Sequence, residues 1–572
     1  MSGMVIRNRS IMKRENKMFV VTAVISFLSG LVFRHGDTYK VTGMGLLTAV
    51  AGALAYYLWL RVRKAETDCR RCAVLCSIMG LFTLALMQGT SWVRSQETIT
   101  NETLEWGTLP VFIVLLTWCG LCIFFEKGIT ENTVAMVIFA GFLMKLYYVV
   151  MTQGHLLQND IEKLADCGGH LGYVYYIYTT HSVPLGNPIG GYQFYQPPLY
   201  YVITAIWLKI YALLGVDPAQ WDEALQMLPV FYTTAILVFL NKIGIRLRYS
   251  PLGRCVTLGL AAFLPYSIYL GGALNNDPLT TLFMVMCVYF TIKWYQEPRL
   301  KTIIAMAVCI GCAMMTKLSG AMIAPAMAVV MLWKAWQNRQ QWKDWVKQFA
   351  CFGLIAFPLG LWHPVHCWID FDMPIGYVPA IPLDDVQYIG MYTKWNRFQD
   401  FRHAVEYLAT RWGPSPDVDY NIPVSLVKFS VFNELHYYDS NQMTYLLGTI
   451  LFWATAVLFV LFVAAFVGWL FMHHHKMIYK VFFGAGSFVI LYGYVKFCLA
   501  YPFVCTMNVR YVMTALYIGV LVLGATVSGV QEKLAGKSAV VRRLFTAMTV
   551  SLTAVYVLCS ALLNFHLEIL LV

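Results

Sequence analysis

Four basic residues stand within apolar stretches of this sequence, a setting in which a charged side chain usually has a function. They are Lys145 in FLMKLYYVV, Lys317 in MMTKLSG, Lys496 in YGYVKFCLAYPF and Arg510 in TMNVRYVM. Any one of them could extend its charge to a nearby membrane surface. Together, at one membrane depth, they favour a binding site for an anion. An anion beside lipid suggests a phosphate group on a lipid carrier.

Acidic residues gather in a polar run between residues 158 and 201, which begins QNDIEKLADCGGHLGY. Asp160 stands near the end of an apolar stretch, where no helix cap is obviously needed, and Asp166 follows it in the same run. A further acid, Asp277 in NNDPL, has two interpretations. It is the kind of residue that begins a helix before proline, or it belongs to the same site as the other acids.

Metal binding stays open on this sequence. His170, His363 and His366 could ligate a divalent ion, but their spacing is not diagnostic of any metal site. Cys69 and Cys72 form a single CxxC without a second pair, which is weak evidence for zinc.

The composition of the chain predicts the elements that must position these residues. Of 572 residues, 59% are hydrophobic and only 13% are charged, whereas a soluble domain carries about 25% charge. Apolar runs of roughly 17 to 25 residues recur along the chain and are typical of membrane-spanning helices. The composition therefore predicts an all-α polytopic membrane protein, and it leaves no soluble basic domain for nucleic acid.

About fifteen spans are expected, the first of them, Met18–Phe33, as a signal anchor that is retained. They cover residues 18–33, 42–60, 72–90, 109–125, 133–151, 225–241, 255–273, 278–294, 302–316, 318–334, 347–363, 443–471, 477–499, 507–528 and 543–564.

Lysine and arginine predict the orientation of these spans, because they concentrate in cytoplasmic loops. The head MSGMVIRNRSIMKRENK and the loop RVRKAETDCRR are both basic, so the N-terminus is expected in the cytoplasm and residue 152 at the outer face. The apolar run 198–214 must then lie along the outer face, since a crossing there would expose every later basic loop. Trp207, Lys209 and Tyr211 suit such an interfacial helix near lipid headgroups.

The order of spans and loops divides the chain into five regions. We expect an N-terminal five-span region, a first outer loop that contains the interfacial helix, core spans, a long outer loop and C-terminal spans. Their boundaries are 1–152, 153–224, 225–363, 364–442 and 443–572.

Four stretches in this order resemble the GT-C superfamily of membrane glycosyltransferases, in particular the bacterial protein O-mannosyltransferase and aminoarabinose-transferase group. They are GGHLGYVYYIY with YQFYQPPLYY, then GGALNNDPL, then GYVPAIPLDDVQYIGMYTKWNRF, and finally LVKFSVFNE with TMNVRYVM. They extend from about residue 140 to 525, so the first four spans lie outside the resemblance and the fifth would be the first helix of a GT-C-like core.

The resemblance implies a function and a set of site residues. Members of the superfamily transfer a sugar from a polyprenyl-phosphate donor with inversion, and an acid in the first outer loop is the base. By position that acid is Asp160, with Asp166 as second choice. Lys317 and Arg510 would hold the donor phosphate, with Lys145 and Lys496 as weaker candidates. The groove would include His170, Tyr173, Tyr195, Gln196, Pro197, Asn276 and Asp277.

Several points depart from this picture or stay open. Gln196 stands where many relatives carry His or Lys, so phosphate binding by that residue is in doubt. Some relatives use a divalent metal and others do not. The sugar is undetermined, and the acceptor could be a lipid, a glycan or a protein. The resemblance suggests a bacterial inner membrane with the active site on the outer face.

A transporter or flippase for an anionic sugar-phosphate lipid is the main alternative. It would place its polar residues at mid-bilayer within inverted repeats. Here the charges collect at one face and no repeat is visible. A polymerase or ligase of envelope polysaccharide would use the same class of donor, and a structural scaffold is a weaker third alternative.

Overall fold

The structure is a computed structural model, and it describes residues 129–152, 154, 169–189, 191, 193–401, 419–433, 442–473 and 475–566, with 20, 23–24 and 26–29 near the N-terminus. These residues are helical, with no named strand among them, apart from one isolated antiparallel bridge between Tyr388 and Phe503. Seven of the helical segments are long and apolar enough to cross a membrane, and shorter apolar helices accompany them. The predicted class, an all-α polytopic membrane protein, is confirmed.

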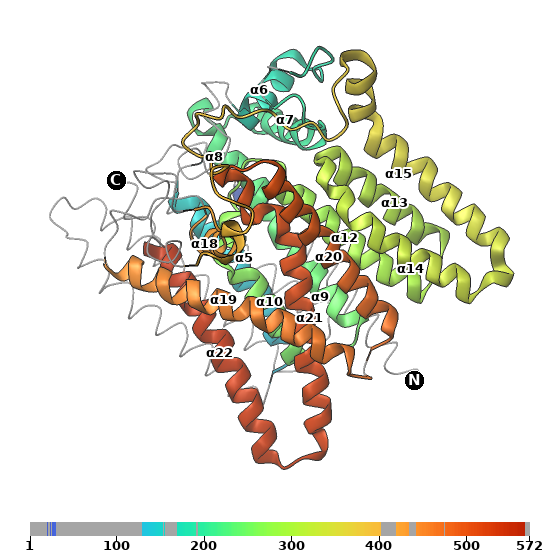
Figure 1. Ribbon diagram of the computed structural model, residues 1–572, viewed down its shortest axis with the longest axis vertical. Helices are drawn as coiled ribbons and strands as arrows, with labels where there is room; N and C mark the ends of the chain where they lie inside the picture. The colour runs from blue at the N-terminus through green and yellow to red at the C-terminus, as the bar shows by residue number, and fades with distance from the viewer. Residues whose placement is uncertain are drawn as a thin grey trace.

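The helices follow one another in the order shown in Figure 1, with short 3₁₀ turns between some of them. Their bounds are α5 Glu131–Met151, α6 Gly169–Thr180, α7 Leu199–Leu213, α8 Trp221–Leu225, α9 Met227–Arg246, α10 Pro251–Phe263, α11 Pro265–Tyr269, α12 Asp277–Gln296, α13 Leu300–Thr316, α14 Ala324–Gln337, α15 Trp342–Phe371, α16 Asn396–Gln399, α18 Ile422–Phe432, α19 Gln442–Leu470, α20 Met477–Ala500, α21 Met513–Lys533 and α22 Ala539–His566. The 3₁₀ turns used below are η4 Leu318–Ile323, η7 Val504–Met507 and η8 Val509–Val512.

Each predicted span from 133–151 onward coincides with a helix, while the spans 42–60, 72–90 and 109–125 lie outside the described residues. The predicted span 255–273 is divided into α10 and α11 at Leu264, which has an extended ψ of 124°. Proline restricts the residue before it to such conformations and cannot donate a helical hydrogen bond. Pro265 therefore ends α10 and begins α11.

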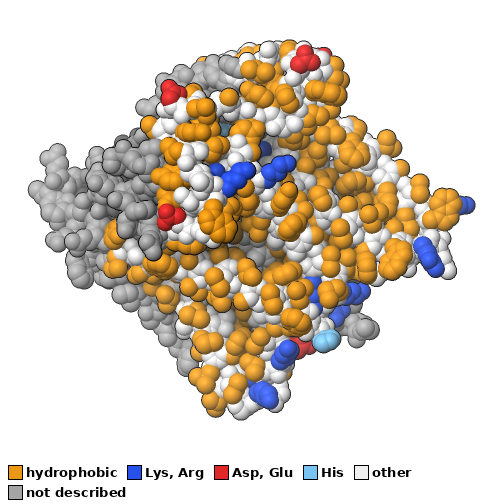
Figure 2. Space-filling model, viewed as in Figure 1, with side chains coloured by type: hydrophobic (Ala, Val, Ile, Leu, Met, Phe, Trp, Pro, Cys, Tyr) orange, Lys and Arg blue, Asp and Glu red, His pale blue; other side chains and the backbone are white. Residues whose placement is uncertain are grey.

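Two kinds of helix make up the bundle. α9 and α21 are mostly buried inside the protein, whereas α14, α15, α19, α20 and α22 expose most of their apolar windows. Exposed apolar side chains cover much of the face drawn in Figure 2. In an integral membrane protein such surfaces face lipid, because lipid is as apolar as the side chains themselves.

α6 and α7 pack against each other at one end of the molecule (Figure 1). α7 corresponds to the run 198–214 and has two faces. Tyr200, Leu208 and Tyr211 are buried, whereas Ile206 is 57% and Leu213 is 78% exposed. This division is typical of a helix that lies on a surface with its outer apolar face against lipid, and its interfacial position stays a prediction.

Candidate functional site

A cavity of about 420 Å³ lies where the first outer loop, the turn after α13, the end of α15, α20 and η8 come together. Six of the residues predicted for the site line it: His170, Tyr195, Gln196, Pro197, Lys317 and Arg510. Its size is in the range of small-molecule sites. Residues far apart in the sequence therefore line one partly open cavity.

Lys317 enters this cavity from the end of α13. Its ammonium nitrogen lies 2.5 Å from Oδ1 of Asp277, and the two side chains are only 14% and 8% exposed. Buried opposite charges stabilise each other's ionised form. The Asp277 carboxylate thus holds the Lys317 ammonium at the cavity wall. Asn276 takes the cap position of α12, and a site shared by Asp277, Asp160 and Asp166 stays a prediction.

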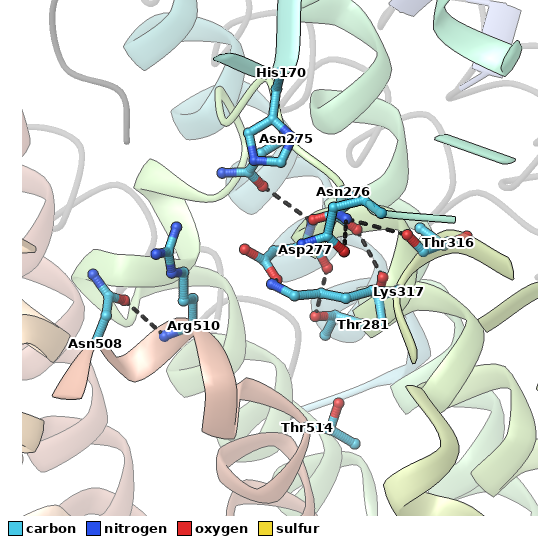
Figure 3. A network of polar contacts seen from close by, with 12 residues as sticks. His170, Asn275, Asn276, Asp277, Thr281, Thr316, Lys317, Asn508, Arg510 and Thr514 are labelled. Atoms are coloured by element: carbon cyan, nitrogen blue, oxygen red, sulfur yellow. Dashed lines mark hydrogen bonds and ion pairs between the residues drawn. The ribbon is translucent and has the colours of Figure 1, made fainter. Parts of the chain in front are cut away.

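The NNDPL motif forms the turn that carries Asp277 (Figure 3). Oδ1 of Asn275 accepts a hydrogen bond from the Asp277 backbone N–H at 3.0 Å. The Asn276 amide donates to the carbonyl of Thr316 at 3.1 Å and to Oε1 of Gln196 at 3.3 Å. This one turn therefore links the first outer loop, the end of α13 and the start of α12.

Arg510 reaches the cavity from η8, on the other side of the space from Lys317. Oδ1 of Asn508 accepts from the Arg510 backbone N–H at 2.8 Å and so caps this short helix. The Asn508 amide in turn donates to Oδ1 of Asn433 at 3.1 Å. Asn433 ends α18 with φ 53° and ψ −152°, which lies outside the left-handed helical region and is strained for a residue with a side chain. The end of the long outer loop is thereby connected to the backbone that presents Arg510.

The ring of Tyr511 lies close to both cations. The Lys317 ammonium is 5.2 Å and the Arg510 guanidinium carbon 5.0 Å from the centre of its ring. Both distances are within the range of cation–π attraction. Phe497 packs edge-on against the same ring at 5.1 Å. The sequence analysis did not identify Tyr511, although its place directly after Arg510 was a signal.

Aromatic side chains pack together beside the cavity, where His170, Tyr195 and Tyr377 line it and Tyr173 and Tyr201 do not. Nδ1 of His170 lies 2.8 Å from the Tyr201 hydroxyl, and the Tyr173 and Tyr201 rings stack at 3.9 Å. Burial raises the pKa of Tyr173, so its hydroxyl stays neutral at physiological pH. Tyr195 contacts Tyr377 of the long outer loop edge-on at 5.8 Å.

The long outer loop is fastened to the bundle beside the cavity. Ile389 N–H donates to Pro502 O at 2.9 Å, and Val504 N–H donates to Gln387 O at 3.0 Å. The buried Arg397 guanidinium donates to Cys498 O at 2.9 Å. These bonds place the segment from Met373 to Pro379 over the cavity, which it lines in part.

Lys145, Lys496 and Tyr173 do not line this cavity. Lys496 is exposed on α20. Lys145 is fully buried in α5, and its ammonium has no hydrogen-bond partner among the described residues. Its side chain passes so close to Gly271 that a Cβ there would lie 2.8 Å from Lys145 Cγ. The absence of a side chain at Gly271 thus leaves room for the Lys145 side chain.

The predicted catalytic acids and the possible metal ion are not among the residues and groups described above. Asp160 and Asp166 lie outside the described residues. Within the described part of the chain, no group of three His, Cys, Asp or Glu side chains is arranged to hold a metal ion. His170 and His363 both line the cavity, whereas His366 pairs with Asp370 on α15.

The middle of the chain matches a known family. Residues 196–362 match the family described as dolichyl-phosphate-mannose-protein mannosyltransferase. The predicted resemblance to GT-C membrane glycosyltransferases is confirmed by this match. The matched segment begins at Gln196, includes the NNDPL turn and Lys317, and ends at Trp362, directly before His363 of α15.

Among solved structures, the chain is similar to that of ArnT from Cupriavidus metallidurans bound to undecaprenyl phosphate. It is 14% identical to this chain, with a TM-score of 0.41, and the likeness covers 76% of this chain and 77% of that one. No curated protein sequence matches the chain.

Proposed function

We propose that this protein is an inverting glycosyltransferase that takes a hexose or pentose from a polyprenyl-phosphate donor. The acceptor would be a lipid, a glycan or a protein at the outer face of a bacterial inner membrane. The observation that supports this best is the cavity in which Lys317, Arg510 and the first outer loop meet. The family match over residues 196–362 supports the same class of reaction.

Two cations in one cavity suit a leaving phosphate. When the bond between the anomeric carbon and the phosphate oxygen breaks, the electron pair stays on that oxygen and negative charge grows there. Fixed positive groups in a site of low dielectric stabilise such charge more than water can. Lys317 and Arg510 would take this role, and Asp277 would keep the Lys317 ammonium oriented toward the phosphate.

A base is needed for the other half of the reaction, because a sugar or serine hydroxyl is a poor nucleophile. Asp160 is the proposed base and Asp166 the second choice. The acceptor oxygen would bond to the anomeric carbon from the side opposite the phosphate, while its proton passes to the carboxylate. That direction of attack inverts the configuration. His170, Tyr195 and Gln196 would contact the sugar from the cavity wall.

Purified protein in lipid vesicles tests the reaction against the transporter alternative. The probe is a polyprenyl phosphate that carries a radiolabelled sugar, and the measurement is the appearance of free polyprenyl phosphate. An enzyme releases it in the presence of an acceptor extract. A flippase moves the intact donor between leaflets and releases none, which would overturn the proposal.

The proposed orientation has its own test. A cysteine introduced at Ala219, in the exposed turn after α7, should react with a membrane-impermeant maleimide added outside intact cells. A cysteine in place of Lys537, in the exposed turn before α22, should react only after the cells are opened. The reverse pattern would place the cavity on the cytoplasmic side.

A further inference from the structure

Basic side chains from four helices meet at the end of the bundle opposite the cavity. α12 and α14 begin beside the cavity and end at the opposite end of the bundle. α20 begins at that opposite end and runs back to the cavity. Arg246 of α9, Lys293 of α12, Lys334 of α14 and Lys476 before α20 stand at the opposite end. Figure 2 shows blue side chains gathered in the lower right part of the drawn face.

The buried ring of Tyr295 is the centre of this group. The Lys334 ammonium lies 4.9 Å and the Lys476 ammonium 5.7 Å from the centre of that ring, and Tyr295 is only 4% exposed. Its hydroxyl donates to Gln337 Oε1 at 3.2 Å. Two ammonium groups on one ring repel each other, so an anion placed between them would stabilise the arrangement.

Arg246 extends the group toward α9 and has unused hydrogen-bonding capacity. Its Nη1 donates to Gln296 Oε1 at 2.9 Å and lies 3.5 Å from Glu297. Its Nε is buried and has no hydrogen-bond partner among the described residues. Glu297 is shared with Arg299 at 3.3 Å. The exposed Glu297 carboxylate therefore pairs with both Arg246 and Arg299, and the buried Nε–H of Arg246 still has no acceptor among the described residues.

Tryptophans beside the group mark the level of the lipid headgroups. Trp333 and Trp336, on either side of Lys334 in the sequence, are 42% and 63% exposed, and their rings lie 5.3 Å apart. Exposed tryptophans of membrane proteins concentrate where the headgroups begin. The basic group thus meets the surface beside lipid, at headgroup level.

We propose that Arg246, Lys293, Lys334 and Lys476, the Tyr295 cluster, bind the phosphate headgroup of an anionic phospholipid. In the predicted orientation this lipid belongs to the cytoplasmic leaflet, so the site is separate from the donor cavity. The number of Lys and Arg residues in the cytoplasmic loops is enough to set the orientation of the spans, wherever those residues stand within the loops. That orientation does not require two ammonium groups from different parts of the chain to share one buried tyrosine ring, with Arg246 over the nearby Tyr289 ring and Lys293 over the Phe290 ring.

Native mass spectrometry of the purified protein, released from mixed vesicles of phosphatidylglycerol and phosphatidylcholine, tests the site. Wild type should retain one phosphatidylglycerol. The Lys334→Gln/Lys476→Gln variant should retain it about tenfold less or lower still, since each basic residue near a charged lipid surface contributes about a threefold to fivefold factor. The matched control Lys343→Gln/Lys347→Gln loses the same charge at the start of α15 and should change retention less than twofold.

The outcomes separate a built site from diffuse attraction. Equal losses in both double variants would overturn the proposal in favour of charge alone. Displacement of the lipid by millimolar inorganic phosphate would show that a soluble anion is the ligand, which also overturns it. Lys476→Gln alone, on an exposed side chain, gives a second reading if the double variant folds poorly, and it should reduce retention about threefold.

Discussion

At each end of the helix bundle two basic side chains lie close to one tyrosine ring, but their surroundings differ. At the cavity, Lys317 and Arg510 lie near the ring of Tyr511, and Asp277 bonds to Lys317 at 2.5 Å. At the opposite end, Lys334 and Lys476 flank the ring of Tyr295 without a carboxylate bonded to either in the described part of the chain. A cavity and a paired acid fix the cations for a reacting group, whereas an open, unpaired cluster suits a ligand that exchanges with the bilayer.

Asp160→Asn would have the largest effect on the proposed reaction and would show whether the cavity end is catalytic. Asparagine keeps the size of the side chain but cannot accept the proton, so turnover should fall about 100-fold or more. Donor binding should change little. Sugar release from labelled donor measures the turnover, and binding of the unhydrolysed donor measures affinity.

Asp166→Asn is the matched control for Asp160 and should lower turnover less. If Asp166→Asn is inactive while Asp160→Asn works normally, the base is the other acid of the same loop. Normal activity in both variants would contradict the assignment of this loop to catalysis.

Arg510→Ala should weaken donor use by one to two orders of magnitude. A charge-assisted hydrogen bond contributes about 1.5–3 kcal/mol, and each 1.4 kcal/mol corresponds to about a tenfold change in affinity. Lys317→Ala should have a comparable effect and should also leave Asp277 buried without its partner. Equilibrium binding of polyprenyl phosphate to protein in nanodiscs measures both. Wild-type affinity in the Lys317→Ala/Arg510→Ala double variant would contradict the assignment of an anion site to this cavity.

Tyr511→Leu should weaken binding of polyprenyl phosphate about fivefold, because the ring that attracts both cations is lost. Tyr511→Phe keeps the ring and removes only the hydroxyl, so this variant should bind polyprenyl phosphate like wild type. A role for the hydroxyl would instead weaken binding in this variant. Tyr492→Leu changes an exposed tyrosine on α20 and serves as the control. Equal loss in the Leu and Phe variants would mean that the hydroxyl, and not the ring, matters.

Asn508→Ala should have the smallest effect of this set. It removes the cap of η8 and the bond to Asn433, and loss of a cap costs about 1 kcal/mol. The KM for donor should rise about fivefold if this free energy goes into the position of Arg510, with kcat little changed. Asn338→Ala at the opposite end of the bundle is the control. An unchanged KM would show that Arg510 keeps its place without the cap.

The spans and their order could be predicted from the sequence, because apolar length is a local property of the chain. The sequence also determined that Lys317, Arg510 and the first outer loop should share a membrane depth, since counting spans and basic loops fixes depth. The break at Pro265 followed a local rule as well, although the run 255–273 was predicted as one span.

Tertiary structure decided which residues of equal depth share a space. Depth alone predicted Lys145 and Lys496 beside Lys317 and Arg510, yet Lys145 is buried against Gly271 and Lys496 is exposed on α20. The rotation of each helix about its axis sets this, and rotation follows from packing against neighbours, which periodicity in nearly uniform apolar segments cannot reveal. The same packing brought Lys317, from a distant part of the sequence, to the ring of Tyr511, a contact that no local pattern encodes.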